Sequence, residues 1–132
     1  MISGANRDIG LEFAQQYAAD GWQVYATARL ATGLRPNLQK GAQKKAVAVS
    51  SLAASMAKYD VPGQYSYRAS KAALNALWRS LAIEWRSLGI ICIVLRPGKV
   101  RARMTGFTGD LNPQESVQGM RRVIAGATLA HL

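Results

Sequence analysis

Tyr67 and Lys71 stand four positions apart near the middle of the chain, and their side chains are of types that can move a proton together. On a helix, this spacing places both side chains on one face. A free tyrosine hydroxyl rarely ionises at neutral pH, but an ammonium group within about 4 to 6 Å favours the phenolate. The pair therefore predicts a proton-transfer site. Such a pair also arises by chance from composition, so the surrounding residues must support it.

Ser51 adds a second hydroxyl, sixteen residues before Tyr67. It follows the short apolar run 46–50, whose length and flanking polar residues predict a strand covered on both faces. Open α/β sheets bind ligands at the carboxyl ends of their strands. A hydroxyl in that place could bind the oxygen of a substrate carbonyl. We therefore predict that Ser51, Tyr67 and Lys71 form one catalytic group.

A glycine turn near the start of the chain, Ser-Gly-Ala-Asn-Arg-Asp-Ile-Gly at 3–10, precedes a predicted helix. Free backbone amides at a helix N-terminus attract a dinucleotide pyrophosphate, and glycines let the backbone approach it. The alternative is an ordinary connection between a strand and a helix. Asp8 occupies the place of the middle glycine, where its negative charge would weaken phosphate binding or would cap the helix.

Arg29 lies nineteen residues past Gly10, at the end of a predicted strand, where such folds recognise the adenosine ribose. An acidic residue there would accept the ribose hydroxyls. Arg29, with Arg7, instead offers guanidinium groups that suit a 2′-phosphate. These residues favour NADP(H) over NAD(H), unless both are simple surface arginines.

The elements that would position these residues alternate between strands and helices, which predicts an α/β layered sheet. The segment 30–45 is either a helix remnant or a loop, because Pro36 and Gly41 interrupt it. A final helix begins after Asn112, with Pro113 at its first position and Glu115 completing a capping box. The other expected elements are strands at 1–2, 22–28, 46–50 and 90–95, the last of them fully buried, and helices at 11–19 and 66–88.

The predicted helix 66–88 has two apolar faces and ends at Gly89. One face needs the sheet as its partner. The other could pack within the same domain or against a second copy of the chain. The first face comprises Leu74, Leu77, Leu81, Trp85 and Leu88, and the second comprises Ala69, Ala72, Ala73 and Ala76.

Length and composition bound the class of protein. A chain of 132 residues with 49% hydrophobic residues predicts a single globular domain spanning 1–132. The one cysteine, Cys92, lies in an apolar run and favours a reducing compartment. No stretch reaches the roughly 18 apolar residues of a membrane span, and the start has no signal-peptide layout. We expect a soluble cytoplasmic protein with no membrane partner.

The net charge of +10 is spread over several segments, which is typical of solvated surface residues. We therefore expect no nucleic-acid partner. A minor alternative is a phosphate-polymer binder that uses the basic loop residues Arg96, Lys99, Arg101 and Arg103.

Five segments occur in the order that is typical of one enzyme family. They are the turn 3–10, Arg29, Ser50-Ser51, the run Tyr-Arg-Ala-Ser-Lys-Ala-Ala-Leu-Asn at 67–75, and Arg96-Pro97-Gly98. On these motifs the chain resembles a short-chain dehydrogenase/reductase. Segments 67–75, 80–85 and 113–117 are especially similar to the sniffer-like and C-factor-like carbonyl reductases.

The resemblance implies a Rossmann-like doubly wound parallel sheet and an NADP(H)-dependent oxidoreductase that reduces an aldehyde or ketone to an alcohol by hydride transfer. Tyr67 would be the proton donor, Lys71 would activate Tyr67 and bind the nicotinamide ribose, and Ser51 would orient the substrate oxygen. The family also implies homo-oligomer contacts through the helix 66–88. The implied cofactor-binding residues are Gly4, Asn6, Arg7, Ile9, Gly10, Arg29, Tyr67, Lys71, Pro97, Gly98 and Val100.

The chain also departs from the family. The block with the acidic adenine contact, the Asn-Asn-Ala-Gly motif and the catalytic asparagine is missing near residue 30, through either a true deletion or a join across unobserved residues. The sheet is therefore expected to lack central strands and the last strand. Ala102 replaces a threonine that bonds the cofactor. An alternative function is a catalytically impaired remnant that acts through the oligomer contacts of the helix 66–88.

Overall fold

The computed structural model describes residues 9, 12, 15–16, 31–58 and 62–131. Glu12, Gln15 and Gln16 are helical, in line with the predicted helix 11–19. The predicted strands 1–2 and 22–28 and Arg29 lie outside the described residues, as does the turn 3–10 except for Ile9. The described elements of regular structure are α2 (Arg35–Lys40), β1 (Lys45–Val49), α3 (Tyr65–Trp85), β2 (Ile91–Leu95) and α4 (Pro113–Gly126).

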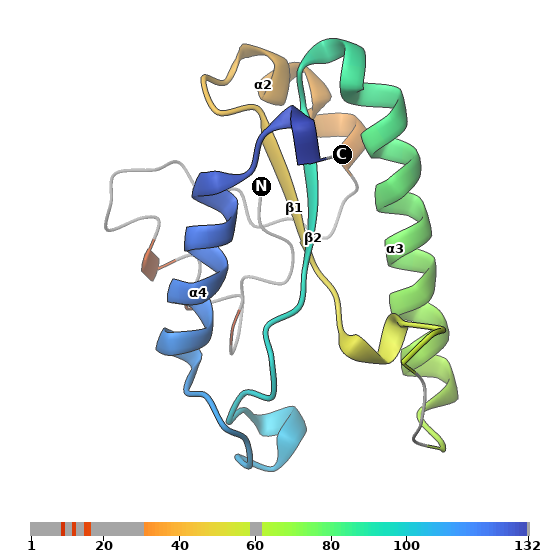
Figure 1. Cartoon of the computed structure of the whole chain (residues 1–132), viewed down its shortest axis with the longest axis vertical. Coiled ribbons are helices and arrows are strands. Elements are labelled where there is room, and N and C mark those ends of the chain that lie inside the picture. The colour runs from red at the N-terminus through yellow and green to blue at the C-terminus, as the bar shows by residue number, and fades with distance from the viewer. Residues whose placement is uncertain (1–8, 10–11, 13–14, 17–30, 59–61, 132) are drawn as a thin grey trace.

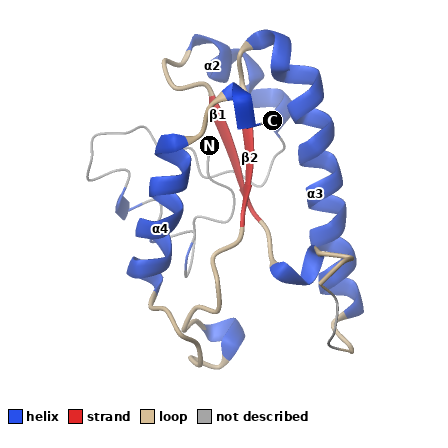
Figure 2. Cartoon of the chain, viewed as in Figure 1, coloured by secondary structure: helices blue, strands red, loops and turns tan. Residues whose placement is uncertain are grey.

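The two described strands form a parallel pair, in which Lys45 lies opposite Ile91 and Val49 lies opposite Leu95. The helix α3 connects them, and Figures 1 and 2 show α3 on one side of the pair and α4 on the other. Parallel strands need such a crossover connection, since a short turn cannot return the chain to the same end. The predicted α/β class is confirmed.

Alternating side chains on the two strands build a separate apolar cluster on each face of the sheet. Beneath α3, the small residues Ala46, Ala48 and Cys92 allow the large indole rings of Trp78 and Trp85 to pack closely. Beneath α4, Val47 and Ile93 pack against the fully buried Val117. The sheet thus presents small side chains to α3 and branched side chains to α4.

The helix ends agree with the capping signals in the sequence. The side chain of Asn112 accepts a hydrogen bond from the Glu115 amide at 2.8 Å, and the Glu115 carboxylate accepts one from the Asn112 amide at 2.8 Å. A short 3₁₀ turn, Arg86–Leu88, continues α3 and ends at Gly89 with φ of 70°, which is the left-handed conformation that glycine adopts readily. The ambiguous segment 30–45 contains α2, because Pro36 is tolerated in the first turn of a helix.

Two expectations about burial are wrong. Leu77 is 39% exposed, and the neighbouring Trp78 points to the sheet in its place, 4% exposed. The strand 90–95 was expected to be fully buried, but Val94 is 39% exposed. The reason is that no described element packs over the Val94 side chain.

The segments after both strands lie at one end of the molecule, the lower end in Figure 1, together with the first turn of α3. After β1 comes the 3₁₀ turn η2 (Leu52–Ala54), which packs against α3. After β2 comes a loop that contains the 3₁₀ turn η4 (Arg103–Thr105). The carboxyl ends of the strands and the start of α3 therefore meet at this end.

The loop between β2 and α4 is held by its own backbone. Val100 and Leu111 form a bridge, and the Asp110 amide donates to the Lys99 carbonyl at 2.9 Å. Gly109 lies inside this closed loop, where a Cβ atom would be 2.6 Å from the Lys99 carbonyl oxygen and 2.9 Å from the Val100 carbonyl carbon. Both of these neighbours are backbone atoms, so they cannot move aside as the end of a flexible side chain would.

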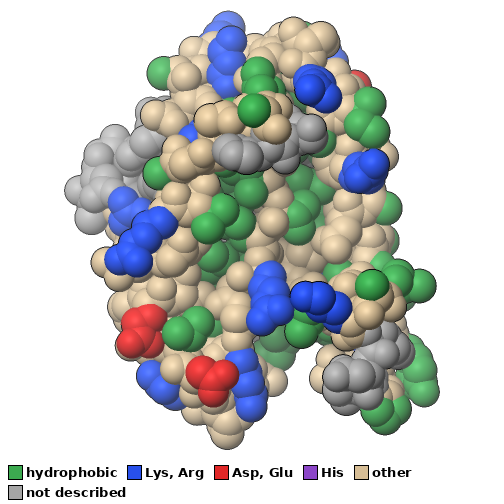
Figure 3. All heavy atoms as spheres, in the orientation of Figure 1, with side chains coloured by type: hydrophobic (Ala, Val, Ile, Leu, Met, Phe, Trp, Pro, Cys, Tyr) green, Lys and Arg blue, Asp and Glu red, His purple; other side chains and the backbone are tan. Residues whose placement is uncertain are grey.

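Lysine and arginine side chains are spread over the face shown in Figure 3 rather than gathered into one patch, and acidic side chains lie near the foot of α4. This distribution agrees with the expectation of solvated basic residues. Within the described ranges, no helix combines the length and the apolar character needed to cross a bilayer.

Replacement of Gly109 by alanine is expected to lower the free energy of unfolding by about 1–3 kcal/mol, because the added methyl group overlaps the loop backbone. Urea denaturation would measure the change. As a control, Gly119→Ala in α4, where nothing lies within 4 Å of the new Cβ, should raise the stability by about 0.5–1 kcal/mol. A Gly109→Ala protein as stable as the parent would contradict the crowding.

Cys92 is expected to react slowly with an alkylating reagent in the native protein. Burial raises the pKa of its thiol from 9.0 to about 11, so at pH 9 only about 1% of the native thiol is ionised, against about half in the unfolded chain. The alkylation rate, followed by mass spectrometry, should increase about tenfold per pH unit up to pH 11. A rate that levels off near pH 9 would contradict this, since it would report reaction through unfolded molecules.

Candidate active site

Lys71 lies in the second turn of α3, and its side chain reaches the carboxyl end of β1. Its Nζ donates a hydrogen bond to the Val49 carbonyl oxygen at 3.0 Å. The same Nζ lies 5.9 Å from the centre of the Tyr67 ring. The lysine is half-buried, so this bond replaces part of the hydration that its ammonium loses. Two of its three protons remain for other partners.

Tyr67 precedes Lys71 by one helical turn and is half-buried on the same face of α3. Its hydroxyl has no hydrogen-bond partner within the described part of the chain. The expected pairing of the two side chains on one face is therefore present, and the phenol remains available to an external group.

Ser51 starts the turn η2 directly after β1. Its Oγ accepts a hydrogen bond from the Ala53 amide at 3.2 Å and remains half-exposed. Because that oxygen only accepts, the hydroxyl proton remains free to be donated. Since η2 packs against α3, the serine lies at the same end of the sheet as Tyr67 and Lys71.

Ser50, one residue earlier, is buried and continues the ladder, with its amide donating to the Leu95 carbonyl at 2.7 Å. Its Oγ is buried and finds no hydrogen-bond partner among the described residues. Buried polar atoms are rarely left unpaired, so this oxygen marks a place for a donor or a water molecule. Of the two serines, Ser50 thus has a buried hydroxyl and Ser51 a half-exposed one.

Pro97, Gly98 and Val100 follow β2 and lie at this same end. The Pro97 carbonyl accepts a hydrogen bond from the buried Ser116 Oγ at 2.7 Å, which joins the loop to the start of α4. Gly98 has φ of 81°, and a Cβ there would be 3.0 Å from the Leu111 side chain. Only glycine fits this turn without strain.

The threonine that the family pattern expects at position 102 is replaced, but a threonine three residues later stabilises the loop. The Thr105 Oγ1 accepts from the Ala102 amide at 3.0 Å and lies 2.7 Å from the Val100 carbonyl oxygen. Ala102 itself is 8% exposed, so its methyl group packs inside the loop. Thr105 shapes the loop from within, since the hydrogen-bond partners of its Oγ1 are backbone atoms of the loop.

The described part of the site fits the nicotinamide side of a dinucleotide. The Lys71 ammonium has protons left that could hold ribose hydroxyls, and the buried Ser50 Oγ has no partner among the described residues. The turn at Gly98 places backbone without a side chain at the same end of the sheet. Of the residues predicted to hold the phosphates and adenosine, Ile9 is half-buried and packs with the cluster under α4. The others, Gly4, Asn6, Arg7, Gly10 and Arg29, lie outside the described residues.

Sequence reasoning did not identify the Val49 carbonyl or the Ser50 hydroxyl as parts of this site. The first carries no signal in the sequence, because every residue has a carbonyl group and only the fold brings this one to Lys71. The Ser50 hydroxyl did carry a signal in the sequence. Two successive serines at the end of a strand point to opposite faces, so Ser50 and Ser51 must have different surroundings.

Comparison with known proteins identifies relatives of one kind. A family model described as short chain dehydrogenase matches residues 29–113. The C-signal protein of Myxococcus xanthus is 38% identical over 103 residues, which cover 78% of this chain and 62% of that protein. An uncharacterized oxidoreductase of Schizosaccharomyces pombe is 41% identical over 66 residues, which cover 50% of this chain and 26% of that protein. The chain therefore spans only part of the length of these relatives.

A solved structure has the same fold. The crystal structure of NADPH-bound carbonyl reductase from chicken fatty liver superposes with a TM-score of 0.80 at 22% identity, covering 98% of this chain and 91% of that chain. This likeness supports the Rossmann-like α/β architecture. Because the family model matches more than half of the residues, the chain belongs to the short-chain dehydrogenase family of oxidoreductases.

Proposed function

We propose that this protein is an NADP(H)-dependent carbonyl reductase that converts an aldehyde or ketone to the alcohol. One observation carries the proposal. The Lys71 ammonium is anchored to the Val49 carbonyl at 3.0 Å and lies 5.9 Å from the centre of the Tyr67 ring, at the end of the sheet where Ser51 stands. The carbonyl reductase whose fold this chain shares was crystallised with NADPH, which supports the same cofactor class.

Tyr67 supplies the proton in this mechanism. Its hydroxyl is free of partners in the described part of the chain, so it can donate to the substrate oxygen as negative charge develops there. The bound NADPH would supply a hydride to the carbonyl carbon, and the proton from Tyr67 completes the alcohol. The residues of this chain therefore have to orient the substrate and supply the proton to its oxygen.

Lys71 performs two tasks. Its positive charge, close to the Tyr67 ring, stabilises the phenolate that remains after proton donation. Its bond to Val49 fixes the ammonium on the rigid end of β1, so little reorganisation is needed during the reaction. The ammonium protons that Val49 does not use would hold ribose hydroxyls of the cofactor.

Ser51 orients the substrate oxygen. Its Oγ already accepts a bond from the Ala53 amide, which leaves the hydroxyl proton for the carbonyl oxygen. Two donors, Ser51 and Tyr67, would then converge on one oxygen. A carbonyl held in this way is polarised before the hydride arrives.

The alternative function is an inactive remnant that acts as a homo-oligomer through α3. The exposed side chains of Leu77 (39%) and Ile83 (69%) on this helix favour such contacts. They do not explain why Lys71 is anchored 5.9 Å from the centre of the Tyr67 ring, so catalysis is the first proposal. We retain a homo-oligomer through α3 as part of either proposal.

Replacement of Tyr67 by phenylalanine is expected to lower the rate of carbonyl-dependent NADPH oxidation by at least about 100-fold, since the proton donor is lost. The ring remains, so the contact with Lys71 and the fold should persist. The rate would be followed by the loss of NADPH absorbance with a panel of aldehydes and ketones. Tyr65→Phe is the matched control, because Tyr65 is 75% exposed two residues earlier, and it should leave the rate unchanged. Equal rates for parent and Tyr67→Phe would remove Tyr67 from the mechanism.

The cofactor preference gives a second test. Arg29→Asp is expected to shift the ratio of NADPH to NADH affinity at least about tenfold toward NADH, because a carboxylate repels the 2′-phosphate and accepts ribose hydroxyls. Cofactor fluorescence titration measures both affinities, and Arg122→Asp, an exposed change in α4, serves as the charge control. An unchanged ratio would remove Arg29 from cofactor recognition. A parent chain that binds neither cofactor but is oligomeric would support the remnant.

A further inference from the structure

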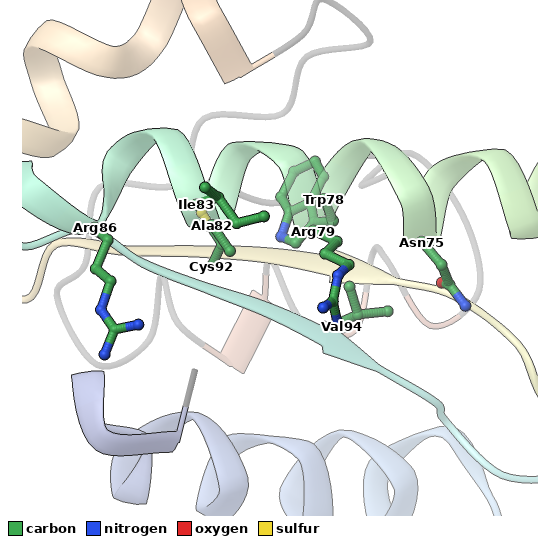
Figure 4. A pocket seen from close by; sticks show the side chains of 8 residues that line it. All are labelled: Asn75, Trp78, Arg79, Ala82, Ile83, Arg86, Cys92 and Val94. Carbon is green, nitrogen blue, oxygen red and sulfur yellow. The ribbon is translucent and has the colours of Figure 1, made fainter.

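The loop after β2 is fastened to α4. Figure 4 shows the hollow between α3 and β2, and no residue of the loop 96–112 is among those that line it. On the α4 side, the Ser116 Oγ donates a hydrogen bond to the Pro97 carbonyl oxygen at 2.7 Å. Pro97 and Gly98 are among the residues expected to hold the cofactor. The contact with α4 therefore acts on the part of the loop that matters most for the candidate active site.

Ser116 departs from the usual behaviour of a helical serine. It is 4% exposed, and Ser50 is the other polar residue that is buried in the described part of the chain. A serine within a helix commonly bonds a carbonyl group of its own helix, as Ser80 does with Ala76 in α3 at 3.1 Å. The Ser116 hydroxyl instead bonds a residue 19 positions earlier, outside α4. Its effect is therefore on Pro97 and not on α4.

The position of Ser116 is itself fixed by its neighbours in α4. Asn112 and Glu115 cap the start of the helix with two reciprocal bonds of 2.8 Å, and the Ser116 amide donates to the Asn112 carbonyl at 3.2 Å. Val117, the next residue, is fully buried in the cluster beneath α4. The donor of the bond to Pro97 therefore belongs to a part of the helix that cap and core both hold in place.

The acceptor belongs to a peptide group that could otherwise turn over. Gly98 has φ of 81°, and glycine adopts positive and negative φ with similar ease, so the Pro97–Gly98 peptide has two accessible orientations. The Ser116 bond selects the orientation in which the Pro97 carbonyl points to α4. Because this peptide is planar and trans, the Gly98 N–H points the opposite way, away from α4.

The Gly98 N–H is a free donor. Gly98 is half-buried, and its amide has no hydrogen-bond partner among the residues that the structure describes. Buried amides are seldom left unpaired, so a ligand oxygen or a water molecule belongs there. Figure 1 shows α3, which carries Tyr67 and Lys71, on the other side of the sheet from α4. The amide is thus turned from α4 toward the side of the proposed catalytic pair.

From these contacts we propose that Ser116 is a positioning residue for the nicotinamide half of the cofactor. It holds the Pro97–Gly98 peptide in the orientation that presents the Gly98 N–H to an oxygen of that half. Since the Lys71 ammonium is available for the ribose hydroxyls, the carboxamide oxygen is the acceptor left for Gly98. This role rests on the proposed NADP(H)-dependent function. Ser116 itself touches neither cofactor nor substrate, because its hydroxyl is used by Pro97.

Calorimetric titration with two ligands tests this role. NADPH contains the nicotinamide, whereas adenosine 2′,5′-bisphosphate contains only the adenosine half. Ser116→Ala is expected to weaken NADPH binding about fivefold, as the loss of one hydrogen bond would, and to leave the bisphosphate affinity within about twofold. Gln118→Ala, which removes an exposed polar side chain from the same helix, should leave both affinities unchanged. Equal losses for the two ligands would overturn the proposal, because Ser116 would then act only on the fold. An unchanged NADPH affinity would overturn it as well.

A measurement on the unsubstituted chain does not depend on how well the variant folds. In a proton–nitrogen NMR spectrum, the Gly98 amide signal should shift when NADPH is added and should stay in place when the bisphosphate is added. A Gly98 signal that NADPH at saturation does not move would overturn the role of Ser116 and leave the proposed function standing. A chain that does not bind NADPH would overturn the proposed function, and the role of Ser116 with it.

Discussion

The hydrogen bond from Lys71 to the Val49 carbonyl is the contact on which the proposed chemistry depends. It joins the start of α3 to the end of β1, and it uses an acceptor that the parallel ladder leaves free at the strand terminus. Two sets of contacts fix the rotation of α3 about its own axis. One is the Lys71 hydrogen bond, and the other, farther along the helix, is the packing of the buried Trp78 and Trp85. Because Tyr67 lies one turn before Lys71, that rotation also decides where the phenol points.

The unequal faces of the sheet explain how α3 comes close enough for this bond. Ala46 and Ala48 present only methyl groups to the helix, so its axis can lie near the strands while its tryptophans fill the remaining space. On the opposite face, the bulkier Val47, Val49 and Ile93 hold α4 at the separation that their side chains impose. Lysine is long enough to reach a strand carbonyl only from a helix that is packed closely.

Much of this architecture could be predicted from local signals. The cap at Asn112, the glycine stop at 89 and the apolar run before Ser50 each depend on neighbours in sequence, and the structure has all three within a residue or so. The pairing of Tyr67 with Lys71 was also predictable, because helical spacing alone determines it. The buried stripe was misplaced at Leu77, since leucine and tryptophan at successive positions satisfy the same helical period and only packing against Ala46 decides between them.

The features that escaped prediction depend on segments far apart in the chain. The exposure of Val94 follows from the absence of a described neighbour beyond β2, which no property of valine reveals. The partner of Lys71 is a backbone carbonyl 22 residues earlier, and the hydroxyl of Thr105 closes a loop whose ends meet at Val100 and Leu111. Arg29 and the glycine turn remain predictions from sequence alone.

The register of the parallel pair also has a consequence for synthesis on the ribosome. Lys45 lies opposite Ile91, and 91 − 45 = 46, so each rung of the ladder joins residues 46 positions apart. The apolar strand β1 therefore leaves the ribosome well before its neighbour exists, and at about 5–20 residues per second it waits for several seconds. During that interval the edge that later pairs with β2 is open to any extended chain nearby. The helix α3, which forms from local contacts within microseconds, can cover one face of β1 before β2 is made, but not that edge.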